Sequence, residues 1–362
     1  MVKNGSDYIE LQLNGGQALV RKRSVDRLRV VDSFAFDCDG TLVDTEGSFT
    51  RATFETVERL LENMHGKRLA PGSASRHILT KLRQTGEYNN DWDSVFAIVC
   101  FISAAYAELG SKGHPVCTGE LLERAAEMVN VFTLSTGSKG VENAKEYTRS
   151  LYAGIGMDRE YSRIMSYLNY PNLPSLSPLS SIYQMLYLGR GENGSMWPDR
   201  TPEGLASSER PLVSAETIRQ LMSISGGRKP AIITGSWRRN VEATLGDIAH
   251  FFDLESSVFI GDLEMSGSAG ALTYRKPSGA GLLHAMDRMG AACMLYSGDS
   301  GEDLLMVASA KESGANVLFA GVTGNSLDPV EFGDYFAGSG ADAVLHSVEQ
   351  LPVLMRELEN IS

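Results

Sequence analysis

Two aspartates placed two residues apart offer the clearest chemistry in this chain of 362 residues. Asp37 and Asp39 come directly after an apolar stretch that ends at Phe36, and Gly40 follows them. Side chains two apart on a strand point the same way, so the two carboxylates are crowded together. Such crowding is costly unless a cation joins the two groups or unless they divide an acid–base task. The pair therefore predicts metal-assisted or acid–base chemistry at the end of a strand.

A hydroxyl and a glycine follow a second apolar stretch, which reads as a strand near residue 230. Thr234 and Gly235 come directly after Ile232-Ile233. A hydroxyl at a strand end, beside a glycine whose N–H can approach closely, suits a phosphate oxygen. On its own this pattern is weak, because Thr-Gly commonly just ends a strand.

Further charged residues lie near the ends of later apolar stretches. Asp299 and Asp303 follow the stretch that ends at Tyr296. Taken alone, they could equally be a helix cap and an acidic first helical turn. Lys276, in Lys276-Pro277, follows the third predicted strand, whereas the competing Lys229 lies at the wrong end of the second. We therefore expect Lys276 to be the lysine that belongs with the aspartates.

The elements that must position these residues alternate between strand and helix from residue 211 onward. This rhythm predicts a mostly parallel, doubly wound α/β sheet. The ends of such strands are where ligands bind in open sheets. Between the first and second predicted strands lies an insertion too long for a loop and helical in character. Its last part, residues 171–212, is rich in Pro, Ser and Gly and predicts a loop. The predicted division is residues 1–30, an extension with a possible β-hairpin; residues 31–44 and 209–362, the α/β core; and residues 45–208, a helical domain.

Composition narrows the class of protein. A net charge of −12 and a pI near 5.1 argue against nucleic-acid partners and anionic membrane surfaces. The 4 cysteines lie far apart and form no C-x-x-C pair, which favours reduced thiols in the cytoplasm. The most apolar run, Val95 to Ala107, has the length of a buried helix and predicts no membrane span. The polar N-terminus shows no signal peptide.

Together, Asp37-x-Asp39-Gly-Thr, Thr234-Gly235, Lys276-Pro277 and Gly298-Asp299-x-x-x-Asp303 resemble the four motifs of the haloacid dehalogenase (HAD) superfamily, in order. The chain is similar to the phosphoglycolate-phosphatase-like branch, in which a cap domain is inserted after the first motif. This resemblance implies a Rossmann-like core with a mainly helical cap.

The resemblance also implies roles for these residues. Asp37 would attack phosphorus and form an aspartyl-phosphate, and Asp39 would be the general acid and base. Thr234, Gly235 and Lys276 would bind the phosphate, with Thr234 and Lys276 counted as catalytic. Mg²⁺ would be held by the Asp37 carboxylate, the Asp39 backbone carbonyl and Asp299, with Asp303 acting through water or by fixing Lys276.

The predicted function is Mg²⁺-dependent hydrolysis of a small phosphate ester. A hexose-phosphate mutase of the same fold carries all four motifs and is the alternative enzyme, and a binding protein with a relic site is the non-enzymatic alternative. In the insertion, Asn89, Asn90, Asp91 and Trp92 resemble a string found in caps of the same branch and could contact the substrate. Equally, Trp92 could anchor the domain core while the polar residues cap a helix. The identity of the substrate and the oligomeric state stay open.

Overall fold

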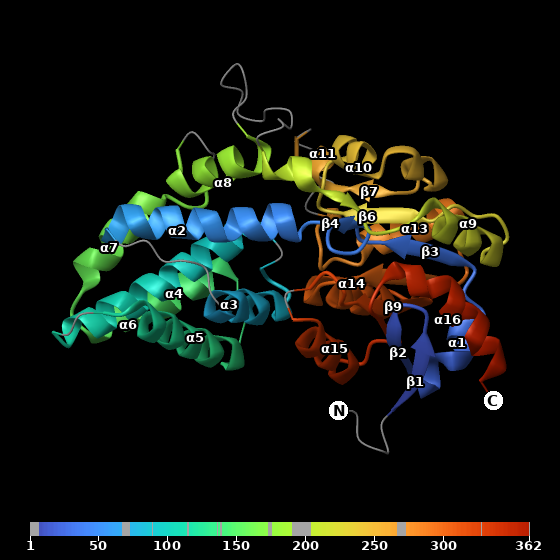
Figure 1. Cartoon of the computed structure of the whole chain (residues 1–362), viewed down its shortest axis with the longest axis horizontal. Coiled ribbons are helices and arrows are strands. Elements are labelled where there is room, and N and C mark those ends of the chain that lie inside the picture. Colours follow the sequence, from blue (N-terminus) through green and yellow to red (C-terminus); the bar gives the residue numbers. More distant parts are fainter. Residues whose placement is uncertain are drawn as a thin grey trace. The chain divides into compact units, whose positions relative to one another are not determined.

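The chain forms two compact units, one of residues 1–45 with 210–362 and one of residues 46–209. We call them the α/β unit and the helical unit. The computed structural model describes residues 7–66, 73–88, 90–113, 116–135, 137, 140–172, 176–189, 204–265, 273–326 and 328–361. Figure 1 shows the elements of both units.

An eight-stranded sheet forms the centre of the α/β unit, in the order β1-β2-β10-β9-β8-β3-β6-β7. Its strands are β1 (Tyr8–Leu13), β2 (Gly16–Arg21), β3 (Ser33–Phe36), β6 (Ala231–Thr234), β7 (Val258–Phe259), β8 (Met294–Gly298), β9 (Val317–Val322) and β10 (Ala343–Leu345). The strands from β10 to β7 are parallel, whereas β1 and β2 form an antiparallel hairpin that pairs with β10. The predicted mostly parallel sheet is thus confirmed. Two short strands, β4 (Val43–Asp44) and β5 (Arg210–Pro211), form a separate antiparallel pair.

Helices cover both faces of this sheet, because the buried side chains of its strands alternate between two hydrophobic cores. Phe34 and Phe36 of β3 point into one core and Ala35 points into the other. The first core is lined by α1 (Val25–Arg29), α9 (Ala215–Ile224), α10 (Arg238–Leu245) and α16 (Leu351–Glu357). The second is lined by α11 (Ile260–Met265), α13 (Ala280–Met289), α14 (Gly301–Glu312) and α15 (Pro329–Gly338). The alternation continues to Asp37, which therefore leaves β3 on the side of the second core.

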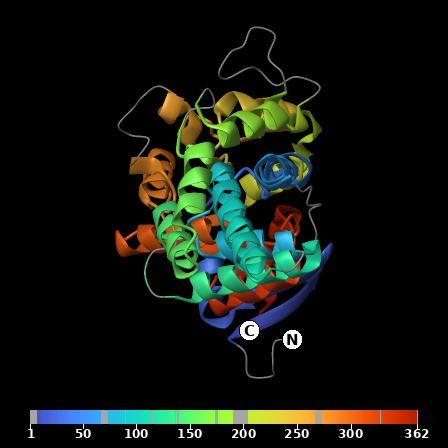
Figure 2. The ribbon, with the colours of Figure 1, turned by 90° about the vertical axis from the view of Figure 1, so that its left-hand side faces the viewer.

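Every regular element in the described part of the helical unit is a helix (Figure 2). The helices are α2 (Arg51–His65), α3 (Ser73–Gln84), α4 (Asp91–Ser111), α5 (Thr118–Leu134), α6 (Val141–Gly154), α7 (Asp158–Leu168) and α8 (Pro178–Leu188). Helix α4 lies in the middle and packs against α2, α3, α5, α6 and α8. Its almost continuous apolar sequence follows from this position, since a helix surrounded by others is hydrophobic all round.

Helix α4 is longer than its apolar run predicted. With 21 residues it could cross a membrane by length and composition, but 78% of its most apolar window is buried inside the protein. Burial of this kind is typical of a core helix.

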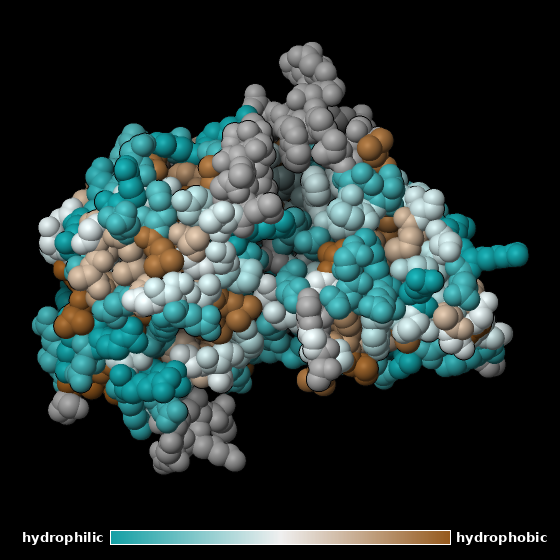
Figure 3. Space-filling view, turned by 180° about the vertical axis from the view of Figure 1, so that it is seen from behind, coloured by the Kyte–Doolittle hydropathy of each residue, from teal (hydrophilic) through white to brown (hydrophobic). Residues whose placement is uncertain are grey.

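On the face shown in Figure 3, hydrophobic residues form small separate groups among hydrophilic ones.

The prediction of a loop over residues 171–212 is wrong for residues 178–188, which form α8. Ser177 caps this helix by accepting a hydrogen bond from the N–H of Ser180, at 3.4 Å. Pro178 stands at the start of the helix, where its missing N–H is tolerated. The Ser and Pro that suggested a loop are therefore the start signal of a helix.

Candidate active site

Asp37 lies where the central strand β3 ends, between β6 and β8. Its N–H donates to the carbonyl of Ser297 on β8, at 2.9 Å, so the backbone is held in the sheet up to this residue. The carboxylate is buried, and its Oδ1 accepts from the N–H of Cys38 at 2.8 Å. The same oxygen lies 2.8 Å from Nζ of Lys276. The sequence-predicted nucleophile and lysine are therefore in direct contact.

Asp303 holds the other side of Lys276. Its Oδ1 lies 2.7 Å from Nζ and also accepts from the hydroxyl of Tyr296, at 2.8 Å. Its Oδ2 accepts from the N–H of Ser300 at 3.1 Å and from the Ser300 hydroxyl at 2.6 Å. Both oxygens of this fully buried carboxylate are thus engaged by protein donors. Asp303 is suited to fixing the lysine, which is one of the two roles that the sequence resemblance implied.

Tyr296 is the residue of this cluster whose role sequence reasoning missed. It is fully buried, and the ammonium of Lys276 lies 5.7 Å from the centre of its ring. Tyr296 lies on β8, three residues before Asp299, and so stands next to the fourth motif. In the sequence it is one more residue of an apolar strand, and nothing there indicates that its hydroxyl reaches Asp303. Tyr296 and the buried Ser297 are adjacent on that strand, so their side chains face opposite sides of the sheet. The hydroxyl is the signal that could have been followed, since a buried Tyr O–H needs a partner.

The charges of this cluster perturb one another. Burial raises the pKa of Asp37 to about 8; Lys276 opposes this shift, whereas Asp303 and Asp39 add to it. Burial alone would lower the pKa of Lys276, but the carboxylates of Asp303 and Asp37 outweigh it and raise that pKa. The lysine therefore stays cationic. The site has an excess of carboxylates over cations, which a divalent ion would relieve.

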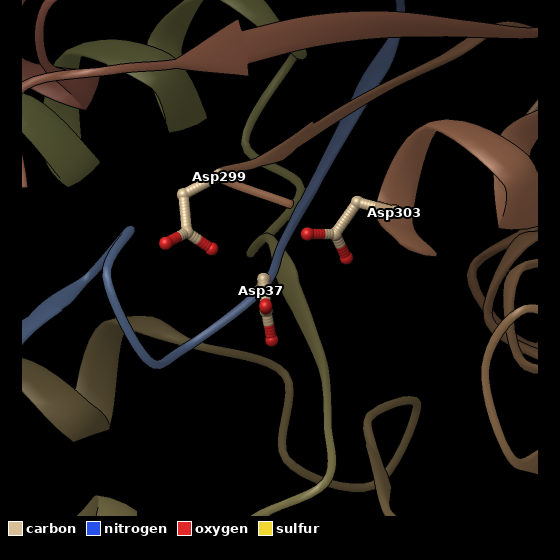
Figure 4. Close-up of side chains that lie close together, drawn as sticks. All are labelled: Asp37, Asp299 and Asp303. Atoms are coloured by element: carbon tan, nitrogen blue, oxygen red, sulfur yellow. The ribbon is translucent and has the colours of Figure 1, made fainter. Parts of the chain in front are cut away.

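Oxygen atoms of Asp37, Asp299 and Asp303 lie within 4.8 Å of one another. Figure 4 shows the three side chains converging from the end of β3, the loop after β8 and the start of α14. A donor set made only of oxygens suits Mg²⁺. Both oxygens of Asp303 accept hydrogen bonds from protein donors, which makes Asp303 less suited than Asp37 to touch a metal directly.

Gly40 makes room for the Asp299 carboxylate. A Cβ at position 40 would lie 2.0 Å from Oδ2 of Asp299, and the backbone there has φ +72°. Only glycine satisfies both conditions without strain. The turn after β3 thus forms a cradle for the carboxylate, which fits the chemistry of a metal ligand.

The acid–base and phosphate-binding candidates meet at the end of β6. Thr234 is buried, and its Oγ1 accepts from the N–H of Ser236 at 3.1 Å. The hydroxyl of Ser236 donates to Oδ2 of Asp39, at 2.7 Å. Gly235 is exposed, and a Cβ there would meet no atom within 4 Å, so the protein itself does not demand glycine. The competing Lys229 precedes β6 and donates to the carbonyl of His250, at 2.8 Å.

In the helical unit, the polar string before α4 makes contacts within the unit. Asn90 caps α4 by accepting from the N–H of Trp92, at 2.9 Å. Asp91 forms an ion pair with Arg83, at 2.9 Å, and accepts from the hydroxyl of Tyr183, at 2.8 Å. The Asn90 cap is the contact that the structural alternative for the string anticipated, whereas the contacts of Asp91 were not part of it and Trp92 is half-buried. Asn89 lies outside the described residues.

Comparison with known proteins rests on three-dimensional structure. No family model matches the chain, and no curated protein sequence matches it. The phosphatase Tt82 from Thermococcus thioreducens is similar over 91% of this chain and 99% of its own, at 20% identity and a TM-score of 0.50. This chain has the haloacid dehalogenase fold. Weaker likenesses are to a predicted phosphoglycolate phosphatase from Haemophilus somnus 129PT (14% identity, 90% of this chain, 97% of that chain, TM-score 0.39). A conserved haloacid dehalogenase-like protein of unknown function from Agrobacterium tumefaciens gives 14% identity, 91% and 99% coverage and a TM-score of 0.41.

In this HAD fold the four motifs come from separate segments of the α/β unit. Asp37 and Asp299 directly follow β3 and β8, and Thr234 is the last residue of β6; the three strands are neighbours in the sheet. Lys276 lies just before α13 and is buried. The carboxyl ends of parallel strands meet at one edge, so strand order alone explains why residues from distant parts of the sequence come together.

Proposed function

We propose that this protein is a Mg²⁺-dependent phosphatase that hydrolyses a small phosphorylated metabolite. The observation that carries the proposal is the buried contact of Asp37 with Lys276, at 2.8 Å, with Asp299 beside it. A cation that touches a strand-end carboxylate can neutralise an incoming phosphate without displacing the nucleophile. A paired buried charge of this kind is expensive to maintain, which counts against a relic site in a binding protein.

Asp37 would act as the nucleophile. One carboxylate oxygen forms a bond to phosphorus while the bond from phosphorus to the ester oxygen breaks, and the bonding pair leaves with that oxygen. Asp39 supplies a proton to the leaving oxygen. Lys276 and the hydroxyl of Thr234 bind the phosphoryl oxygens, with the N–H of Gly235 as a further donor.

Hydrolysis of the aspartyl-phosphate would return the site to its starting state. Asp39, now a carboxylate, takes a proton from water as the water oxygen bonds to phosphorus and the bond to Asp37 breaks. Asp37, Asp299 and the Asp39 backbone carbonyl would hold Mg²⁺, with Asp303 behind them; when bound, the ion supplies positive charge that offsets the phosphate and the carboxylates.

We propose that residues 46–209 serve as the substrate-selecting cap that this fold uses. The proposed setting is the cytoplasm, which suits four free cysteines of which three are buried. We infer no nucleic-acid or membrane partner, in line with the net charge of −12.

The test is to incubate the purified protein with a panel of phosphate esters and Mg²⁺, and to measure both free phosphate and isomerised ester. We expect free phosphate from at least one small ester, none in EDTA, and none from Asp37→Asn, since an amide cannot form the acyl-phosphate. Including hexose 1-phosphates distinguishes the alternative enzyme, because rapid isomerisation with negligible phosphate release would show a mutase. Binding of esters without any turnover would favour the binding protein.

A further inference from the structure

Ser236 links two of the groups that the proposed reaction uses. It stands two residues after Thr234, in the connection between β6 and α10. Its N–H donates to Oγ1 of Thr234 at 3.1 Å, and its own hydroxyl donates to Oδ2 of Asp39 at 2.7 Å. Asp39 lies 197 positions away in the sequence, so only the pairing of β3 with β6 brings the two together.

The hydrogen bond from Ser236 fixes the orientation of the Asp39 carboxyl group. Because Oδ2 accepts from the Ser236 hydroxyl, the carboxyl group cannot turn without losing that bond. A length of 2.7 Å is typical of a hydroxyl that donates to a carboxylate. Ser236 also orients the hydroxyl of Thr234. Because Oγ1 of Thr234 accepts from the N–H of Ser236, the Thr234 hydroxyl hydrogen points away from that N–H.

We propose that Ser236 is a positioning residue that holds the carboxyl group of Asp39, the proposed general acid and base, in the orientation that the reaction needs. This inference rests on the proposed phosphatase. In the first step the carboxyl proton of Asp39 moves to the ester oxygen as that oxygen leaves phosphorus with the bonding pair. In the second step the Asp39 carboxylate takes one proton from the attacking water as the water oxygen bonds to phosphorus and the bond from phosphorus to Asp37 breaks. Throughout, Oδ2 keeps the Ser236 hydrogen bond, and the sum is ester plus water giving alcohol plus phosphate.

A purely structural role for Ser236 makes a different prediction. If the hydroxyl only ties the loop after β6 to the turn after β3, its loss would slow all substrates alike. If it positions the general acid, its loss matters most where the leaving oxygen needs a proton. The oxygen of 4-nitrophenyl phosphate leaves as a stable anion, whereas that of glycerol 2-phosphate, an alkyl ester, does not.

The experiment compares Ser236→Ala with the full-length wild-type protein on these two esters. The measured quantity is kcat/KM, which reports the steps from free enzyme up to cleavage of the ester. We expect kcat/KM for glycerol 2-phosphate to fall roughly 10- to 100-fold more than that for 4-nitrophenyl phosphate, a part of what general acid catalysis supplies. Ser236→Thr, which keeps the hydroxyl, should restore most of the difference. The dissociation constant for Mn²⁺, measured by calorimetry, should stay within about twofold in Ser236→Ala, since no metal ligand is removed.

Ser256→Ala is the matched control. Its hydroxyl donates to Oδ2 of Asp253, also at 2.7 Å, and the residue precedes β7, away from the strand end that carries the site; it is buried, whereas Ser236 is half-buried. It should leave the ratio of the two kcat/KM values unchanged. An equal fall on both esters in Ser236→Ala would overturn the positioning role alone. Inactivity of the wild type on every phosphate ester would instead overturn the proposed function, and the inference with it. Should Ser236→Ala fail to fold, Ser236→Gly gives the same comparison.

Discussion

Replacing Gly40 by alanine should damage the metal site by a route that can be separated from general destabilisation. Residue 40 has φ +72°, and an alanine pays about 1–2 kcal/mol in this left-handed region. Its Cβ would also lie 2.0 Å from Oδ2 and 2.6 Å from Cγ of Asp299. Since carbon contacts are comfortable near ~3.5 Å, the carboxylate must move by more than about 1 Å.

Gly290→Ala supplies the backbone strain without the collision. Gly290 ends α13 at φ +61°, and its Cβ would meet nothing within 4 Å. We expect Gly290→Ala to lose about 1–2 kcal/mol in the free energy of unfolding, measured by urea denaturation in EDTA, and Gly40→Ala to lose at least as much, because the collision adds to the strain. Only Gly40→Ala should also bind Mg²⁺ roughly tenfold or more weakly, because a ligand displaced by that much no longer meets the geometry of the ion. Wild-type affinity for Mg²⁺ in Gly40→Ala would refute the argument that Asp299 is a ligand held against this turn.

Three more predictions follow from the site and from the helical unit. In EDTA the free energy of unfolding should fall as pH rises from about 4 to about 8. Burial raises the pKa of Asp37 from 3.8 to about 8. Between these pH values the folded protein keeps a proton on Asp37 that the unfolded chain releases, so rising pH favours the unfolded chain. Asp37→Asn should flatten that fall, and an unchanged slope would contradict the assignment. Asp299→Ala should raise the Mg²⁺ concentration needed for half-maximal turnover, read from a metal titration, whereas the surface variant Asp328→Ala should not. Asn90→Ala should destabilise the protein by about 1 kcal/mol through loss of the α4 cap, with KM for the best ester unchanged; a shifted KM would instead favour contact with the substrate.

The sequence was sufficient to predict the parallel sheet and the polar residues at the strand ends near the site. Apolar stretches before Asp37, Thr234 and Asp299 correspond to β3, β6 and β8, and the alternation of strands and helices predicted the parallel sheet. These strands can be predicted because each is buried on both faces, so its sequence is a nearly continuous apolar run.

Contacts between distant side chains could not be predicted in the same way. Nothing in the local pattern shows that Ser236 reaches Asp39 or that Tyr296 reaches Asp303, because these contacts depend on strand order and on helix placement. Asp91 likewise looked free to meet a ligand, but Arg83 and Tyr183 lie beside it only in the folded unit. Composition misled at α8, where Ser177 and Pro178 start a helix instead of a turn.

The pairing of β2 with β10 has a consequence for folding during synthesis. Ala343 and Val344 pair with Val20 and Leu19, so β2 leaves the ribosome long before the strand β10 with which it pairs. Residues 46–209 form a continuous segment and emerge between them, and domains generally fold as units during synthesis. The α/β unit, by contrast, closes its sheet only through contacts of very high sequence separation, which are slow to form. A nascent chain that stops before residue 343 therefore carries a helical unit able to fold beside a hairpin whose partner strand has not yet been translated.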